Sequence, residues 1–147
     1  MGDTESPARI LVPVNGTENS DRAVDVGVSL ASAIGASLDI LFVSYFDSST
    51  DGAGDDSWLP EAVAGPAALA SRSVLMRARR RVPDGVTVML HHRSGIPAKQ
   101  ILSFIKEHDV RTVILGRRSQ GLVESLLMGS ISQEVLENAP CAVVIVK

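Results

Sequence analysis

The sequence predicts a doubly wound α/β fold, in which helices cover both faces of a five-stranded parallel sheet. Five short β-rich runs alternate with helical patterns in strict order, and such alternation produces parallel strands joined by right-handed crossovers. Most of these runs are nearly continuous stretches of aliphatic residues, as expected of strands buried on both faces. The runs cover residues 9–14, 37–43, 86–91, 112–115 and 142–146, and the third is more amphipathic than the others.

The first helical pattern begins behind the cap candidates Thr17 and Asn19 and ends at Gly35. Its apolar and small residues share one helical face, which we expect to lie on the sheet. The residues of that face are Ala23, Gly27, Leu30, Ala31 and Ile34.

Three further helices are expected along the chain. One spans about residues 60–81 and ends in the basic cluster 77–81, which complements the negative end of the helix dipole. The next starts at Pro97, a favourable first helical residue, and the last follows Gly129. The acidic stretch at about 47–58 is rich in Ser, Gly and Asp, so we expect it to form a flexible loop.

Length and composition favour a single domain over residues 1–147. The formal net charge is −3, so the chain lacks the basic field that gathers nucleic acid, and we expect no nucleic-acid partner. Cys141 is the only cysteine, which excludes an intramolecular disulfide and favours a reducing compartment. The sequence shows neither a secretory signal nor the roughly 18 apolar residues of a membrane span. We therefore expect a cytoplasmic protein that is not bound to a membrane.

Ligands of doubly wound folds bind outside the carboxyl ends of the strands, at the point where the direction of winding reverses. This rule predicts a site at the loops that follow Val14, Val43 and Leu115.

The last of these loops leads into the fourth predicted helix. A helix that starts at Ser130 would have Ser130 as its N-cap and Gln133 three residues later, which is the pattern of a capping box. The free N–H groups at that helix end would bind an anion, and the hydroxyl groups of Ser130 and Ser132 would add donors. Gly129 would let a phosphate approach closely. An ordinary helix start explains the same residues.

Gly116 and two arginines begin the same loop. Gly116 lies where a bulky side chain would obstruct a ribose, and Arg117 and Arg118 make the loop basic. The two arginines fit a solvated turn equally well. The spacing of Gly116 and Gly121 is Walker-like, but the lysine that a Walker loop requires is absent.

Several motifs of the chain match those of a known family. Gly116, Gly129 and Ser130 follow the pattern of a glycine, two residues, a second glycine, nine residues and then Gly-Ser or Gly-Thr, with Ser119 in place of the second glycine. The other matching segments are Ile-Leu-Val-Pro-Val at 10–14, Gly-Ile-Pro at 95–97 and the closing strand with its approach at 139–146. Over nearly its whole length, the sequence resembles the universal stress protein family, in particular its ATP-binding members.

The resemblance implies a flavodoxin-like fold of the adenine nucleotide alpha-hydrolase kind, with strand order 3-2-1-4-5. It also implies a site for ATP or another adenine nucleotide, which Mg²⁺ could accompany, held chiefly by phosphates and water. The nucleoside would border residues 13–15, the adenine Val43 and the ribose Gly116, while the phosphates would lie at the start of the last helix. The implied cofactor-binding residues are Pro13, Val14, Asn15, Val43, Gly116, Arg117, Arg118, Ser119, Gly129, Ser130, Ile131 and Ser132.

Two of these residues depart from the family pattern. Asn15 stands where the family usually has Asp, so a carboxylate acceptor is missing, although an amide can still accept a hydrogen bond. Ser119 replaces a glycine and adds a side chain, whose hydroxyl group could itself contact phosphate.

The strand order implied by the resemblance places strand 142–146 at an edge of the sheet. Its aliphatic residues carry no charge before Lys147, and such an edge invites pairing. Family members commonly dimerise through this strand, so the resemblance implies a homodimer through 142–146, acting on an unidentified regulatory partner protein.

Three functions are open at this point. The first is a dimeric ATP-binding sensor for stress, and the second is a nucleotide-independent interaction module in which Asn15 and Ser119 mark an altered site. The third is a slow ATPase or a protein modified on a loop serine, for which the sequence offers no general base. We expect no catalytic or metal-binding residues, because His91 and His92 point to opposite faces of a strand and cannot hold one metal together.

Overall fold

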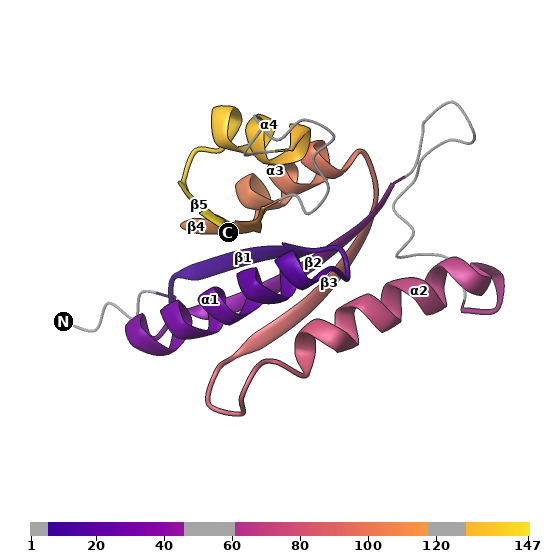
Figure 1. Cartoon of the computed structure of the whole chain (residues 1–147), viewed down its shortest axis with the longest axis horizontal. Helices are drawn as coiled ribbons and strands as arrows, with labels where there is room; N and C mark the ends of the chain where they lie inside the picture. The colour runs from indigo at the N-terminus through magenta and orange to yellow at the C-terminus, as the bar shows by residue number, and fades with distance from the viewer. Residues whose placement is uncertain (1–5, 46–60, 118–128) are drawn as a thin grey trace.

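The computed structural model describes residues 6–45, 61–117 and 129–147, with side chains described outside 45 and 61–69. Strands and helices alternate along these residues (Figure 1). The strands are β1 (Arg9–Val14), β2 (Ser37–Tyr45), β3 (Val88–Gly95), β4 (Thr112–Gly116) and β5 (Ala142–Val146). The helices are α1 (Glu18–Ile34), α2 (Glu61–Arg79), α3 (Pro97–Glu107) and α4 (Ser130–Asn138). The predicted flexible loop at 47–58 lies outside the described residues.

The sheet has the strand order β3-β2-β1-β4-β5, and every neighbouring pair is parallel. The predicted doubly wound topology is therefore confirmed. β1 lies at the centre and pairs with both β2 and β4, so the direction of winding reverses between β1 and β4. Ligand sites of this architecture lie at the carboxyl ends of such strands.

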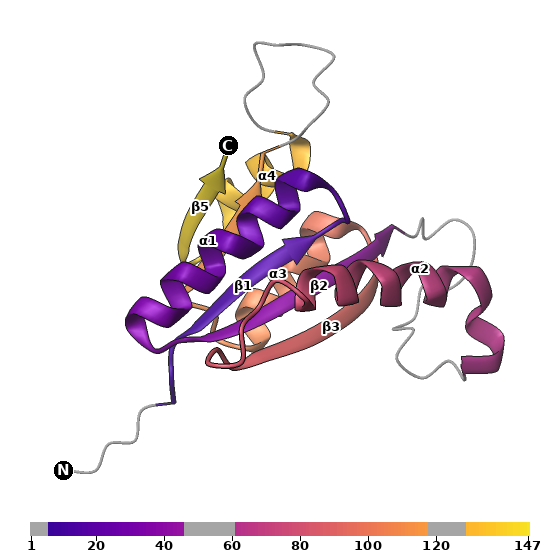
Figure 2. The same ribbon diagram turned by 60° about the horizontal axis from the view of Figure 1, so that its bottom comes forward.

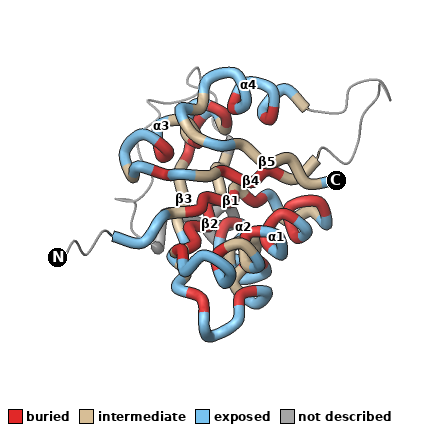
Figure 3. The backbone as a smooth tube through the Cα atoms, turned by 90° about the vertical axis from the view of Figure 1, so that its left-hand side faces the viewer, coloured by how far each residue is buried: buried red, intermediate tan, exposed pale blue. Residues whose placement is uncertain are grey.

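Helices cover both faces of the sheet. α1 and α2 lie on one face, and α3 and α4 lie on the other (Figure 2). Ile10, Val12 and Val14 of β1 belong to the core under α1 and α2, whereas Leu11 belongs to the core under α3 and α4. Figure 3 shows buried residues gathered in the strands between the helical layers. Burial on both sides explains why β1 is a continuous aliphatic run.

α1 closely follows its prediction. Thr17 is the N-cap and accepts a hydrogen bond from the N–H of Ser20, and Gly35 ends the helix in the left-handed region with φ of 69°. Ala23, Gly27 and Ala31 are buried as expected, and Leu30 is partly buried. Ile34 is the exception, with 58% of its surface exposed, while Val24 is buried although the prediction omitted it.

The bounds of β3 differ most from the prediction, because the strand spans Val88–Gly95 and not residues 86–91. The predicted strand ended where a polar run begins, since polar residues are unusual inside a buried sheet. β3 is an edge strand, however, and its polar side chains have partners. His91 Nε2 lies 2.9 Å from Asp39 Oδ1, and His92 Nε2 lies 2.6 Å from Ser44 Oγ.

Two glycines let α1 approach the sheet closely. A methyl group on Gly27 would lie 2.8 Å from Val12 Cγ2, and one on Gly116 would lie 2.6 Å from the carbonyl carbon of Asn19. Both distances are shorter than a carbon–carbon contact allows. The missing Cβ at Gly116 therefore lets the first turn of α1 lie directly against the end of β4.

Asp39 of β2 is a charged residue in the interior of the protein, and only 1% of its surface is exposed. Arg9 donates from Nε and Nη2 to its two carboxylate oxygens at 2.8 Å each, and His91 donates from Nε2. Burial opposes ionisation of Asp39, but the hydrogen bonds from His91 and Arg9 outweigh burial and lower its pKa to about 2. Asp39 is thus ionised and paired at neutral pH.

Replacing Asp39 by Asn is expected to lower the free energy of unfolding at neutral pH by about 1–2 kcal/mol. The pKa of Asp39 is lowered by folding, so its stabilising contribution is present above the unfolded-state pKa near 4 and is lost as the pH falls toward 2. Urea titrations followed by circular dichroism between pH 7 and pH 2 would measure this difference. The control is Asp25→Asn, which breaks an exposed pair with Arg81 and should cost less than about 1 kcal/mol. Parallel pH profiles for wild type and Asp39→Asn would contradict the prediction.

Gly116→Ala is expected to destabilise the fold by about 1–3 kcal/mol, because the added methyl group meets backbone atoms of Asn19 that cannot rotate away. Gly85→Ala is the matched control, since a methyl group there has no neighbouring atom within 4 Å. Urea unfolding at neutral pH would compare the two variants. Equal midpoints for both would show that α1 does not depend on the close approach.

Candidate functional site

A pocket of about 780 Å³ opens at the carboxyl ends of β1, β2 and β4, within the ~300–1,000 Å³ typical of small-molecule sites. Its walls come from the loop after β1, the first turn of α1, the end of β4 and the beginnings of α3 and α4. The pocket therefore lies at the switch point that the strand order predicts.

Ten of the twelve residues predicted for the site line this pocket. They are Pro13, Val14, Asn15, Val43, Gly116, Arg117, Gly129, Ser130, Ile131 and Ser132. The other two, Arg118 and Ser119, lie outside the described residues. The structure thus brings together residues near the ends of β1, β2 and β4 and at the start of α4, which are far apart in the sequence.

Seven further lining residues were not predicted for the site. They are Thr17, Asn19, Ser20, Leu41, Pro97, Ile101 and Leu115. Leu41 and Ile101 are also core residues, so their aliphatic pattern alone gives no sign of a ligand. Sequence reasoning treated Thr17 and Asn19 only as candidate helix caps. A helix cap at the switch point of the sheet also lies where a ligand binds, and this signal could have identified both residues as part of the site.

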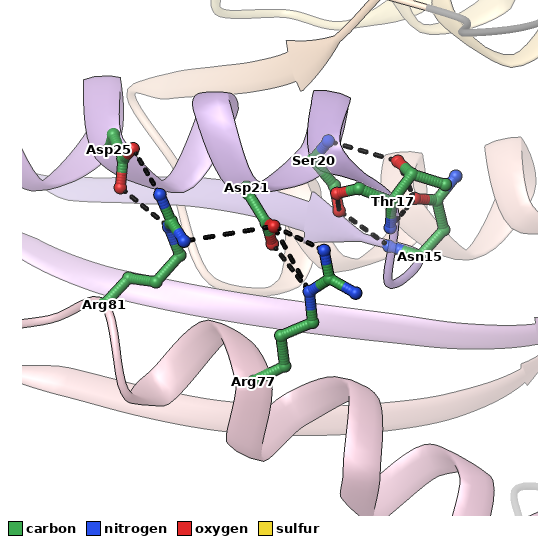
Figure 4. A network of polar contacts seen from close by, with 7 residues as sticks. All are labelled: Asn15, Thr17, Ser20, Asp21, Asp25, Arg77 and Arg81. Carbon is green, nitrogen blue, oxygen red and sulfur yellow. Dashed lines mark hydrogen bonds and ion pairs between the residues drawn. The ribbon is translucent and has the colours of Figure 1, made fainter.

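The loop between β1 and α1 is held by a chain of hydrogen bonds (Figure 4). Asn15 Oδ1 accepts from the N–H of Thr17 at 3.2 Å and from Thr17 Oγ1 at 2.6 Å. Thr17 Oγ1 in turn accepts from the N–H of Ser20, and Ser20 Oγ donates to the carbonyl of Thr17 at 3.0 Å. The side chains of this loop therefore have hydrogen-bond partners within the protein itself.

Two arginines of α2 and its following turn anchor the beginning of α1 (Figure 4). Arg77 donates from Nε and Nη2 to the carboxylate of Asp21, with a closest contact of 2.6 Å. Arg81 pairs with Asp25 at 2.8 Å. The hydrogen bond to Asp21 raises the pKa of the Arg77 guanidinium, so Arg77 keeps its charge in this pair. Asp21 directly follows Ser20, so the contact with α2 bears on a wall of the pocket.

The beginning of α4 differs from the prediction. Gly129 is the N-cap in extended conformation, Ser130 is the first helical residue, and no side chain caps the helix. The predicted capping box of Ser130 and Gln133 is therefore wrong, because the backbone enters the helix one residue before the predicted position, with Gly129 and not Ser130 as the N-cap. The side chain of Gln133 donates instead to Glu137 at 3.3 Å. Residues 129–132 at this helix end line the pocket. The first N–H groups of a helix have no partner within the helix, so such an end suits an anion.

Gly116 and Arg117 connect β4 with the pocket. The structure explains Gly116 by the backbone of α1 that lies against it, whereas the prediction had explained it by access for a ribose. The N–H of Arg117 donates to the carbonyl of Val146 at 2.7 Å, so the position of Arg117 depends on the end of β5. Of the described residues that line the pocket, Arg117 alone has an ionisable side chain.

The chemistry of this lining suits an anionic ligand with an apolar part. Val14, Val43 and Leu115 offer aliphatic surface, while the hydroxyl groups at the start of α4 and the charge of Arg117 offer donors. Neither a carboxylate nor an imidazole lines the pocket within the part of the chain that the structure describes. These residues therefore provide no general base and no anionic ligand for a magnesium ion.

The histidines and the cysteine lie away from the pocket. His91 bonds to Asp39 in the core beside α3, and His92 stacks on Phe42 on the other side of the sheet, as their adjacency on a strand predicts. Burial raises the pKa of the Cys141 thiol, which makes it a poor nucleophile. The described residues contain no cluster of His, Cys, Asp or Glu suited to a metal ion, and none of their helices is long and apolar enough to cross a membrane.

Comparison with known proteins gives one consistent result. Residues 8–147 match the sequence model of the universal stress protein family. A Thermus aquaticus protein named universal stress protein in QAH/OAS sulfhydrylase 3′region is 31% identical over 142 residues, covering 94% of this chain and 97% of that protein.

Two solved structures share the fold. One, described as a universal stress protein in complex with cAMP, has a TM-score of 0.67 and 20% identity, and the match covers 95% of this chain and 96% of the other. The second, from Archaeoglobus fulgidus and described as in complex with dAMP, has a TM-score of 0.65 and 15% identity, with 96% and 98% covered. The sequence match extends over the whole α/β fold and every described wall of the pocket, and this chain belongs to the universal stress protein family.

Proposed function

We propose that this protein binds an adenine nucleotide, ATP among them, in the pocket at the carboxyl ends of β1, β2 and β4, and acts as a dimeric cytoplasmic regulator of a stress response. The observation that supports the proposal is that one pocket has both aliphatic walls and hydrogen-bond donors suited to a phosphate group. The two parts match the two chemical halves of a nucleotide.

The aliphatic part suits a planar base. Val14 is the last residue of β1, and Val43 lies near the end of the neighbouring strand β2. Leu41 and Ile101 also line the pocket and belong to the core under α3. Apolar side chains favour a flat ring by burying its faces.

The polar part suits phosphate. Gly129 is the N-cap of α4, Ser130 and Ser132 add hydroxyl groups, and Arg117 adds a positive charge. An anion at a helix N-terminus gains from the free N–H groups and from the helix dipole together. Magnesium, if it accompanies the nucleotide, would be held by phosphate oxygens and water, since the described lining offers it no carboxylate.

Structural relatives support a nucleotide of the adenine class. Two structures with the same fold are described as complexes with cAMP and with dAMP, and both ligands combine adenine with a phosphate group. The proposed role is regulatory and not catalytic, because the described lining places no general base beside the donors for phosphate.

The proposed homodimer forms through β5, which is an edge strand of the sheet. The N–H of Ala142 donates to Arg111 and the carbonyl of Val146 accepts from Arg117, so the backbone groups of these residues face β4. Backbone groups alternate in direction along a strand, so those of Val143 and Ile145 face the open edge. A second copy can pair there without disturbing the sheet.

Wild-type protein stripped of nucleotide is expected to bind Mg·ATP saturably in isothermal titration, and Gly129→Val is expected to weaken binding at least about tenfold. The valine would block close approach of phosphate, while the extended conformation of Gly129 accepts any side chain, so the fold should persist. Gly85→Val makes the same change away from the pocket, with no atom within 4 Å of the new Cβ, and should bind as wild type does. A folded wild-type protein that binds no nucleotide would favour the nucleotide-independent module.

Val143→Pro is expected to convert the dimer to a monomer at about 10 µM, as measured by sedimentation velocity. Proline removes an N–H that faces the open edge and leaves the hydrogen bonds to β4 in place. Val143→Ala is the matched control, since it also loses the valine side chain but keeps the N–H, and it should stay dimeric. A wild-type protein that sediments as a monomer would refute the proposed assembly.

A further inference from the structure

Asn19 of α1 is a nearly buried polar side chain in the wall of the pocket. Only 7% of its surface is exposed, and it lies in the first turn of the helix. Within the part of the chain that the structure describes, no residue forms a hydrogen bond with its amide group. Buried polar side chains nearly always have a partner, so the amide of Asn19 is suited to a partner outside the chain.

The amide group of Asn19 opens toward the pocket. Among the described residues, no side-chain nitrogen or oxygen is both fully enclosed by protein and without a hydrogen bond. The amide atoms of Asn19 therefore keep a small accessible surface, and the space that Asn19 lines is the pocket. Ser20 is buried to a similar degree but has partners in the chain, since its Oγ donates to the carbonyl of Thr17. The amide of Asn19 thus has bonding capacity that the described chain does not use.

The backbone of the same turn adds further donors. The first hydrogen bond within α1 runs from the N–H of Asp21 to the carbonyl of Thr17, and the N–H of Ser20 donates to the Thr17 side chain. The N–H groups of Glu18 and Asn19 come before these bonds and have no partner within the helix. The carboxylate of Asp21 is paired with an arginine of α2, and the side chain of Glu18 is exposed and lies outside the pocket lining. This turn therefore offers donors and a positive helix end, both of which suit an anion.

Asn19 lies at the end of the pocket where phosphate is proposed to bind. Its backbone lies against Gly116 at the end of β4, whereas Val43, in the proposed wall for adenine, lies near the end of β2. β1 separates these two strands, so the two walls are two strand spacings apart, or roughly 10 Å. A base at Val43 therefore leaves the far part of the nucleotide beside Asn19.

The other donors of the pocket already match one phosphate group. The start of α4 offers free N–H groups and the hydroxyl groups of Ser130 and Ser132, which is enough for the oxygens of one phosphate. α1 lies on the opposite face of the sheet from α4 (Figure 2), so the donors around Asn19 form a separate wall. A second donor set on a separate wall suits a second phosphate group.

We propose that the first turn of α1 is a second phosphate subsite, in which Asn19 Nδ2 donates to a phosphate group other than the one at the start of α4. The ligand is then a nucleoside diphosphate or triphosphate, and a monophosphate fills only part of the site. This inference rests on the proposed function, because it names the class of nucleotide that the same pocket selects.

Asn19→Ala tests the subsite, because it removes the amide without changing any charge or the backbone that packs on Gly116. We expect wild type to bind ADP and ATP more tightly than AMP in isothermal titration. The variant should bind ADP and ATP about tenfold more weakly, as expected for the loss of one hydrogen bond to a charged group, and should bind AMP and adenosine as wild type does. Its unfolding midpoint should not fall, since the amide has no partner in the described part of the chain.

Two further variants accompany this test. Asn19→Asp keeps the shape of the side chain and replaces the donor by a charged acceptor, so it should weaken ADP and ATP binding by at least as much. Asn138→Ala is the matched control, since it removes an exposed amide from the other end of α4, outside the pocket lining. It should leave every affinity unchanged.

Four results would overturn the subsite. An equal loss for AMP and ATP would show that Asn19 contacts the same phosphate as α4, and a loss for adenosine would show that it contacts the nucleoside. Unchanged ADP and ATP binding by Asn19→Ala, or a wild type without preference for ADP and ATP over AMP, would show that no second subsite exists. A wild-type protein that binds neither adenosine nor any of the nucleotides would instead refute the proposed function itself.

Discussion

The backbone of α1 lies directly against the sheet, and the position of the pocket walls depends on this contact. Gly27 leaves room for Val12, and Gly116 leaves room for the backbone of Asn19. Side chains in a close-packed core can shift slightly to accept a larger neighbour, but a helix backbone moves only as a unit. The glycine at the end of β4 therefore holds the whole first turn of α1 at the switch point. Thr17, Asn19 and Ser20 line the pocket as a consequence of that packing.

The first turn of α1 combines three structural tasks in very few residues. Thr17 caps the helix, Asn15 closes the turn before it, and Asp21 receives the guanidinium of Arg77 from α2. An exposed ion pair contributes little to stability, but the Asp21 side chain is only 13% exposed and its contact with Arg77 is bidentate. The pair consequently limits how α2 can move relative to the pocket wall. The basic cluster at the end of α2 thus has a specific partner helix, which the dipole argument alone did not identify.

Sequence reasoning succeeded where local pattern and global packing agree. β1 is buried between the two helical layers and is therefore aliphatic on both faces, and it was predicted with its observed bounds. The bounds of β5 were also predicted as observed, because this edge strand is a continuous aliphatic run. The end of β3 was missed because His91 and His92 obtain partners from distant residues, Asp39 and Ser44, that no local pattern shows. The start of α4 was misplaced because Gly129 and Ser130 are both suitable N-caps by residue type, and only the backbone angles decide between them. Gly116 was recognised as important, but its reason lies in the contact with Asn19, which exists only after folding.

Arg117 connects the proposed site with the open edge of the sheet. Its side chain lines the pocket, and its backbone N–H donates to Val146, the last residue of β5. A bound nucleotide would act on Arg117, and a second copy of the chain would act on β5. These two groups of residues are joined by the hydrogen bond from the N–H of Arg117 to the carbonyl of Val146. Binding equilibria that share a structural element are coupled reciprocally, so a nucleotide that strengthens pairing must itself bind the pair more tightly by the same factor. The first turn of α1 is held against β4 and α2. Because Arg117 directly follows β4 and bonds to the end of β5, coupling between ligand and assembly would pass through these two strands.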